Sequence, residues 1–158
     1  MGSGSLAILG FLRIESHLIL YSEGGVYKIT LVKSIPEDYF EEKNNDLGDK
    51  VISELKEYFN GQRKDFNLPL IIQGTNFQRT VWEELRKINY GEIKTYSDIA
   101  KNIGKPNACR AVGNANNKNP FMIVIPCHRV VGKNKKSGGY AFGVDIRDKL
   151  LELEKLYK

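Results

Sequence analysis

The sequence predicts an α/β N-terminal subdomain, made of a small antiparallel sheet and one helix, followed by a mainly α-helical domain with a helix-turn-helix. Three observations support this class. Strand-like runs come first, a segment with helical apolar spacing follows them, and two capping-box sequences then open further helices. We therefore expect domains at residues 1–66 and 75–158, joined by a linker at residues 67–74.

The first domain is predicted from residues 6–14, 18–21 and 26–32, which are rich in aliphatic and β-branched side chains. The Ser-Glu-Gly-Gly sequence at residues 22–25 predicts a hairpin turn before the third run. Apolar residues recur at helical spacing between residues 47 and 59, and Gly61 follows as a C-terminal stop. Nothing in residues 1–60 indicates chemistry.

The second domain carries clear helix start and stop signals. Residues 75–78 and 95–98 have the form of capping boxes, and each precedes an apolar helical pattern. We expect the second of these helices to end at Gly104. Pro106 suits a first helical turn and is expected to open the next helix, which runs to about Asn116. Two short helices joined by a glycine-containing turn predict a helix-turn-helix.

The helix expected after Pro106 has few long side chains. Small residues occupy Ala108, Ala111, Gly113 and Ala115, and Arg110 is the one long side chain. Such a smooth helix could lie close to a nucleic-acid groove while Arg110 projects into it. Alternatively, the small residues only allow tight helix packing and Arg110 lies in solvent.

The final helix is expected from about residue 144 to residue 157. At 100° per residue, Glu154 falls between Leu150 and Leu151, within the apolar stripe. A buried carboxylate needs a partner. Two interpretations follow: Glu154 lies at a frayed end in water or beside a lysine, or it orients a histidine.

Composition narrows the class of protein. The chain has 158 residues, 41% of them hydrophobic, and no apolar run approaches the roughly 20 residues of a membrane span. Its first residues lack a signal-peptide pattern. Two cysteines make no disulfide framework, which favours a reducing, intracellular setting. We expect a cytoplasmic protein with no membrane partner.

The net charge of +5 favours a polyanionic partner such as nucleic acid, but so small an excess is equally typical of a protein with a few spare lysines. Metal binding is not expected. The soft ligands show no close paired spacing, and they are Cys109, Cys127, His17 and His128. We therefore expect no metal and no cofactor.

The strongest candidate for chemistry is the run Pro126-Cys127-His128-Arg129-Val130. A free cysteine has a pKa of about 8.5, so it is only a few per cent ionised near neutrality without neighbouring cations or donors. His128 and Arg129 are such neighbours. A Cys-His pair alone is weak evidence, because cysteine often acts as a small buried hydrophobe. In an extended segment adjacent residues point to opposite faces, so a direct Cys127–His128 contact is not assumed.

Taken together, these residues resemble the DNA repair alkyltransferases that remove alkyl groups from the O6 oxygen of guanine. The resemblance covers residues 75–154, about half of the chain. It rests on Pro-Cys-His-Arg-Val followed by Val131, on Asn119-Pro120, on the run at residues 110–113, on Thr95-Tyr96, and on Leu150-Leu151-x-x-Glu154. It implies a ribonuclease-H-like N-terminal subdomain and a winged-helix-like catalytic domain.

The resemblance also implies a mechanism. Cys127 would attack the alkyl carbon of a flipped-out guanine and keep the alkyl group. His128 would take the thiol proton through a water, and Glu154 would orient His128. Tyr96 would donate a proton to the leaving base and help to turn the nucleotide out. The reaction would be stoichiometric, chiefly with O6-methylguanine and with O4-alkylthymine as a second candidate.

Further roles are implied for the helix after Pro106 and for the active-site segment. The helix would lie in the minor groove of double-stranded DNA, where Arg110 fills the gap left by the extruded base. The other DNA-contacting positions implied are Ala111, Gly113 and Asn114. Three residues would support the active site structurally, and these are Asn119, Pro126 and Arg129. The protein is expected to be a monomer.

The base pocket is implied to include Tyr140, Ala141 and Phe142. The family usually has glycine where this chain has Phe142. Our hypothesis is that Phe142 narrows the pocket and disfavours bulky adducts such as benzyl. Equal methyl-to-benzyl rate ratios in the wild type and Phe142→Gly would refute it.

Three other interpretations stay open. A lesion-binding relative would flip and hold the base without transfer, although such proteins lack the reactive cysteine. A helix-turn-helix regulator would explain the basic charge but not Cys127, His128 and Glu154 together, and it predicts sequence-specific footprints that survive Cys127→Ala. A cysteine hydrolase with His17 as its base would have to turn over an ester or peptide, and nothing near His17 indicates an oxyanion site.

Overall fold

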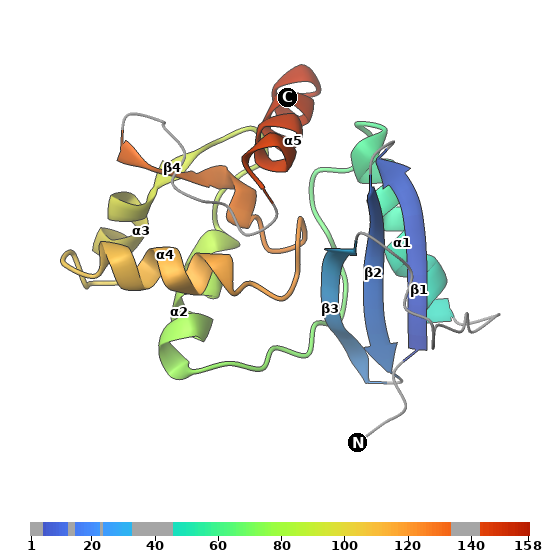
Figure 1. The fold of residues 1–158 in the computed structure, drawn as a ribbon, viewed down its shortest axis with the longest axis horizontal. Helices are drawn as coiled ribbons and strands as arrows, with labels where there is room; N and C mark the ends of the chain where they lie inside the picture. Colours follow the sequence, from blue (N-terminus) through green and yellow to red (C-terminus); the bar gives the residue numbers. More distant parts are fainter. Residues whose placement is uncertain (1–4, 13–14, 23, 33–45, 134–142) are drawn as a thin grey trace. The chain divides into compact units, whose positions relative to one another are not determined.

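A computed structural model describes residues 5–12, 15–22, 24–32, 46–133 and 143–158. The chain divides into two compact units. The first, called the sheet unit, comprises Met1–Ile72 together with Pro120–Met122. The second, called the helical unit, comprises Gln73–Asn119 and Ile123–Lys158. The predicted division into a small N-terminal sheet and a helical C-terminal part is confirmed (Figure 1).

The sheet unit contains three antiparallel strands in the order β1-β2-β3 and one helix. Strand β1 is Ser5–Leu12, β2 is Glu15–Ser22 and β3 is Gly25–Val32. Helix α1, Asp46–Phe59, contacts β1 and β2 and covers one face of the sheet (Figure 1). As predicted, β2 and β3 pair as a hairpin, with Ser22 opposite Gly25, and Gly61 follows α1 with a positive φ of 75°.

Two segments from further along the chain pair with β3. The amide of Val26 donates to the carbonyl of Pro69, and the amide of Ile71 donates back to Val26, so residues 69–71 extend the sheet. In the same way Ile29 exchanges hydrogen bonds with Pro120 and Met122. The backbone after Asn119 is therefore anchored in the sheet unit before it returns to the helical unit.

The helical unit starts with two helices that open as predicted. Helix α2 is Asn76–Leu85 and α3 is Tyr96–Asn102. Thr75 and Gln78 form a reciprocal capping box on α2, and Thr95 and Asp98 form one on α3. Strand β4, Lys94–Thr95, leads into α3 and pairs in parallel with β5, Val130–Val131. Because β5 directly follows the Cys127 segment, this pairing ties that segment to the start of α3.

The remaining helices differ partly from the prediction. Helix α4 is Cys109–Asn117, so Pro106 lies in the preceding turn and not in a first helical turn. Gly104 ends α3 with a positive φ of 76°, which redirects the chain, and the turn that contains Pro106 then connects Gly104 to the start of α4. The Cys127 segment is also not extended: Cys127–Arg129 forms a 3-10 turn, η1. Helix α5, Val144–Leu156, agrees with the predicted final helix.

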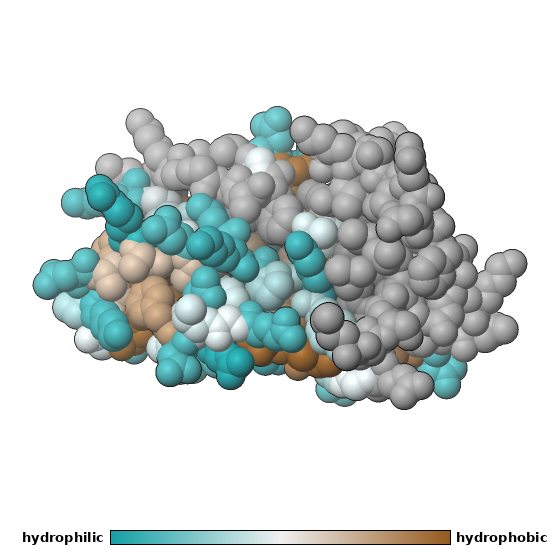
Figure 2. All heavy atoms as spheres, turned by 60° about the horizontal axis from the view of Figure 1, so that its bottom comes forward, coloured by the Kyte–Doolittle hydropathy of each residue, from teal (hydrophilic) through white to brown (hydrophobic). Residues whose placement is uncertain are grey.

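The core of the helical unit forms where α2, α3 and α4 meet. Trp82 is buried on α2, and its indole N–H donates to the carbonyl of Ala115 on α4 at 2.9 Å. This bond fixes the last turn of α4 against α2. On the face drawn in Figure 2, hydrophilic side chains of the described residues surround smaller hydrophobic areas. No helix in the described ranges is long and apolar enough to cross a membrane.

Candidate active site

Cys127 is buried at the start of η1, with 1% of its surface exposed. Its amide donates to the carbonyl of Ile125 at 2.7 Å, and its own carbonyl accepts from the side-chain amide of Asn116 at 3.3 Å. Pro126 precedes the turn, and its carbonyl accepts from the amide of Arg129 at 3.0 Å. The backbone on both sides of the thiol is therefore held by hydrogen bonds.

The segment leading to Cys127 has an unusual backbone conformation. Ile123 has a φ of 72°, in a left-handed region that a β-branched residue rarely adopts. The side chain of Asn119 donates to the carbonyl of Ile125 at 2.7 Å. Ile123 and Asn119 are both buried, so packing in the core and the Asn119 hydrogen bond together hold this backbone conformation.

His128 and Glu154 form a buried pair. The imidazole Nε2 lies 2.5 Å from Glu154 Oε2, and neither side chain is exposed. Glu154 lies on the face of α5 that also buries Leu150, and α5 packs against η1. The interpretation that Glu154 frays into water is therefore wrong, and the carboxylate has a histidine partner.

Arg129 completes the environment of Glu154. Its Nε donates to Oε1 at 2.7 Å, its Nη2 donates to Oε2 at 3.2 Å, and its Nη1 donates to the carbonyl of Ile88 at 2.7 Å. The amide of Gly91 donates to Oε1 at 3.1 Å, and the guanidinium lies 5.6 Å from the ring centroid of Tyr90. Sequence reasoning missed the 88–91 loop, since only tertiary packing brings it to Glu154.

These contacts set the charges of the pair. Burial alone would raise the pKa of Glu154, but the hydrogen bonds from His128 and Arg129, together with the positive charge of Arg129, outweigh it and hold that pKa well below its usual range. Burial lowers the pKa of His128, and Glu154 opposes this only in part. Near neutrality Glu154 is thus ionised and His128 is neutral. Since an ionised carboxylate only accepts, Nε2 carries the hydrogen and Nδ1 has the lone pair.

Tyr96 is half-buried at the start of α3, beside α4. A Cβ atom at Gly113 would lie 3.9 Å from the Tyr96 ring, so the ring lies directly against that turn of α4. Burial raises the pKa of Tyr96, Arg147 opposes the rise, and Cys127 adds to it. The hydroxyl is therefore protonated at neutral pH and lies within electrostatic range of the cysteine.

Helix α4 has one exposed side and one buried side. Arg110, Ala111 and Asn114 are exposed, whereas Val112 and Ala115 are buried. Apart from Arg110, the exposed side of α4 thus carries only short side chains. It adjoins a hollow of about 180 Å³ against the start of α2, lined in part by Ala111 and Asn114.

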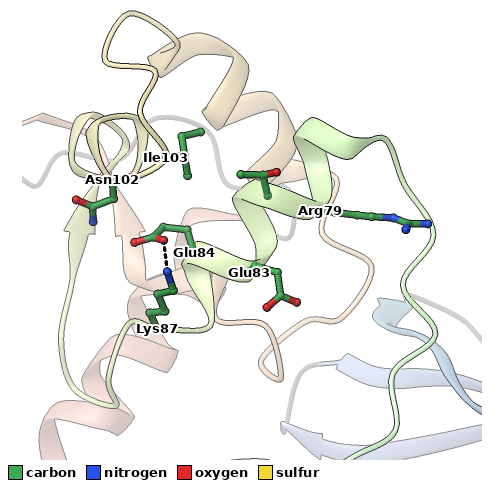
Figure 3. Close-up of a pocket in the computed structure, with 7 residues that line it drawn as sticks. Arg79, Glu83, Glu84, Lys87, Asn102 and Ile103 are labelled. Atoms are coloured by element: carbon green, nitrogen blue, oxygen red, sulfur yellow. Dashed lines mark hydrogen bonds and ion pairs between the residues drawn. The ribbon is translucent and has the colours of Figure 1, made fainter.

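A larger hollow of about 420 Å³ lies between α2 and the end of α3 (Figure 3). Lys87 donates to Glu84 there at 2.9 Å, and Asn102 and Ile103 contribute from the end of α3. None of the predicted site residues lines it.

The described residues do not place every residue of the sequence-based interpretations at this site. Tyr140, Ala141 and Phe142 lie outside the described residues. His17, the base in the hydrolase interpretation, belongs to β2 of the sheet unit, whereas His128 follows Cys127 directly. Across the described ranges, no group of three or more His, Cys, Asp and Glu side chains is placed to hold a metal ion.

The fold and the site define a class: a two-unit protein in which a buried cysteine adjoins a His-Glu-Arg cluster beside a short-chained surface helix. Comparison with known families gives the class its name. Residues 76–156 match the DNA binding domain of 6-O-methylguanine DNA methyltransferase, and residues 18–72 match the ribonuclease-like domain of the same family. The chain belongs to the 6-O-methylguanine DNA methyltransferase family, as the sequence resemblance predicted.

Relatives support this over most of the chain. The methylated-DNA--protein-cysteine methyltransferase of Methanosarcina acetivorans is 44% identical over 142 residues, which cover 87% of this chain and 90% of the relative. The Methanosarcina mazei protein of the same name is 51% identical over 120 residues, covering 76% and 75%. Both alignments extend well beyond the five-residue motif around Cys127.

Solved structures agree with the sequence comparison. The crystal structure of Mycobacterium tuberculosis O6-methylguanine methyltransferase has a TM-score of 0.88 at 32% identity, covering 99% of this chain and 95% of that one. A structure of Mycobacterium tuberculosis OGT in complex with DNA has a TM-score of 0.82 at 34% identity, covering 92% and 90%.

Proposed function

We propose that this chain repairs DNA by transferring the alkyl group of O6-alkylguanine, chiefly O6-methylguanine, to Cys127 in a single turnover. The observation that carries the proposal is the buried Cys127 turn with the His128–Glu154 pair behind it. Relatives that are 44% and 51% identical are named methylated-DNA--protein-cysteine methyltransferases. Double-stranded DNA containing an alkylated guanine is thus the proposed partner.

The reaction is a displacement at the alkyl carbon. His128 takes the thiol proton of Cys127 through a water, and the sulfur then forms a bond to the alkyl carbon as the bond from that carbon to O6 breaks. The electron pair stays with the departing guanine, which takes a proton from the Tyr96 hydroxyl. The product is a thioether, which has no easy route back to a thiolate, so each molecule reacts once.

The charges of the pair suit His128 to act as a base. A neutral imidazole with its lone pair on Nδ1 accepts a proton there, while Glu154 holds Nε2–H. The positive charge that develops on His128 then faces an ionised carboxylate. Arg129 keeps Glu154 ionised throughout, and it acts as a positioning residue.

DNA binding is assigned to α3 and α4 as a helix-turn-helix within a winged-helix-like domain. The exposed side of α4 enters the minor groove through Ala111, Gly113 and Asn114. Arg110 fills the gap left by the extruded nucleotide, and Tyr96 helps to turn that nucleotide out. Extrusion costs a few kcal/mol, which phosphate contacts from lysines and arginines offset in part.

The rest of the chain supports this chemistry. Residues 1–66 form a ribonuclease-H-like subdomain, residues 67–74 lead from its sheet, where residues 69–71 pair with β3, to the catalytic domain at residues 75–158, and Asn119 and Pro126 hold the cysteine segment. We further propose that the base pocket includes Tyr140, Ala141 and Phe142, which lie outside the described residues. The protein acts as a monomer in the reducing cytoplasm, where Cys127 stays a thiol. O4-alkylthymine is a second candidate substrate.

Titration with a duplex that carries a labelled O6-methylguanine tests this function. We expect label on the protein to rise with DNA and to level off at one methyl per molecule. Continued turnover would overturn the single-use mechanism. Tight lesion binding without transfer would support the lesion-binding alternative instead.

A further inference from the structure

Asn116 is a buried polar residue in the last turn of α4, with 1% of its surface exposed. Its side-chain amide donates to the backbone carbonyl of Cys127 at 3.3 Å. It is one of three asparagines at positions 114, 116 and 117, and the other two are exposed. Of these three asparagines of α4, Asn116 is therefore the one turned inward.

Stability alone does not explain an asparagine at this position. The Oδ1 atom of Asn116 is buried and has no hydrogen-bond partner among the described residues. A half-satisfied buried amide costs free energy that an apolar side chain of similar size, such as leucine, avoids. The hydrogen bond to Cys127 is thus the feature that an apolar residue would lose.

The hydrogen bond fixes the backbone that carries the nucleophile. The amide of Cys127 donates to Ile125, and its carbonyl accepts from Asn116, so both of its backbone polar groups are engaged. In a displacement at carbon, the sulfur, the alkyl carbon and O6 must lie in line, and small displacements of the attacking atom slow the reaction strongly.

Asn116 also belongs to the helix that carries the proposed DNA contacts. Arg110 and Ala111 lie on the exposed side of α4, and Asn116 lies on its buried side. The bond from Trp82 to the carbonyl of Ala115 holds that same turn against α2. One rigid helix therefore joins the exposed surface to the cysteine backbone.

We propose that Asn116 is a positioning residue that sets the placement of Cys127 relative to DNA bound on α4. The inference rests on the proposed function and adds to it a residue that links DNA binding to the alignment of the thiol. Asn116 contacts neither the alkyl group nor the base, and it acts through the Cys127 carbonyl.

Asn116→Leu removes the donor at nearly constant volume, and Asn117→Leu is a matched control on the exposed neighbouring position. Three quantities are compared with the wild type: the single-turnover methyl-transfer rate at saturating duplex, the Kd for DNA, and the rate of Cys127 alkylation by iodoacetamide. We expect Asn116→Leu to slow transfer by about tenfold or more. We also expect the Kd and the iodoacetamide rate to stay within about twofold, because DNA binding does not involve the thiol and iodoacetamide, which is not held by the protein, can approach the thiol from its own in-line direction.

A general structural defect would have a different signature, because a loosened domain would bind DNA less well and expose the thiol to iodoacetamide. Asn116→Met, an apolar side chain that cannot donate, is expected to show the same selective loss and replaces the leucine variant if that one does not fold. In the wild type, the NMR signals of the Asn116 side-chain amide should shift when Cys127 is methylated, whereas those of Asn117 should not.

Transfer in folded Asn116→Leu or Asn116→Met within about twofold of the wild type would overturn the inference. An equal loss in Asn117→Leu, or Asn116 signals unchanged by methylation, would do the same. Failure of the wild type to accept a methyl group would instead overturn the proposed function.

Discussion

His128 Nε2 and Glu154 Oε2 lie 2.5 Å apart, with both side chains fully buried in the helical unit. The pair is not isolated, because Arg129 bonds both oxygens of the same carboxylate. One buried anion is thus shared between a permanent cation and a titratable imidazole. This sharing keeps Glu154 ionised and lets His128 remain neutral and basic.

Replacing Glu154 with glutamine is expected to destabilise the fold and slow methyl transfer. The change leaves Arg129 as a buried cation without its carboxylate, which costs about 3–5 kcal/mol of unfolding free energy. Urea denaturation measures the loss, and Glu152→Gln on the exposed side of α5 is the control. A loss below about 1 kcal/mol would show that the ion pair is not needed for stability.

The unfolding free energy is expected to fall as the pH is lowered. Folding lowers the pKa of His128 from its ordinary 6.5 and that of Glu154 from its ordinary 4.5, so the unfolded chain binds more protons than the folded one. The contribution of His128 is complete above pH 6.5 and is lost below it, and that of Glu154 is lost below pH 4.5. Urea titrations between pH 4 and pH 8 check this, and stability that rises on acidification would contradict it.

Arg110→Ala is expected to slow methyl transfer from duplex DNA but not from the free base. Without the side chain that fills the gap, the extruded state is less favourable, and transfer from a duplex should slow by about tenfold or more. Reaction with free O6-methylguanine should not change, since no base is extruded. Stability should change by less than about 0.5 kcal/mol because Arg110 is exposed. Equal slowing with the free base would refute a role in extrusion.

Tyr96→Phe separates the hydroxyl from the ring. The ring should still lie against Gly113, so the DNA affinity is expected to hold, while loss of the proton donor slows transfer by about a hundredfold. The raised pKa of Tyr96 keeps the donor protonated, so the wild-type rate should not fall through this group below pH 10. Single-turnover rates for both proteins test this, and equal rates would remove Tyr96 from the proton transfer.

Local features of the fold were predictable from the sequence. Thr75 and Thr95 start helices because their side chains cap the first turn, and this requires only residues three positions away. The helical wheel indicated that Glu154 falls within the apolar stripe of the last helix, and the structure decides between the two interpretations in favour of burial. In each case the cause lies within a few residues of the chain.

Features that depend on distant contacts were not predictable. The bonds from Gly91 and Ile88 to the Glu154–Arg129 cluster join residues separated by 63 and 41 positions, and they use backbone atoms that no sequence pattern marks. The pairing of Ile29 with Pro120 and Met122 is of the same kind. Asn116 was missed because Asn114 and Asn117 look identical to it until the packing of α4 shows which one is turned inward.

The most direct test is the intact mass of the protein after mixing with a duplex that carries a single O6-methylguanine. Cys127→Ala serves as the parallel control. We expect the wild type to gain the mass of one methyl group, which peptide mapping places on Cys127, and the control to gain none. No mass change in a wild-type protein that binds the duplex, or a methyl group at another residue, would contradict alkyl transfer to Cys127.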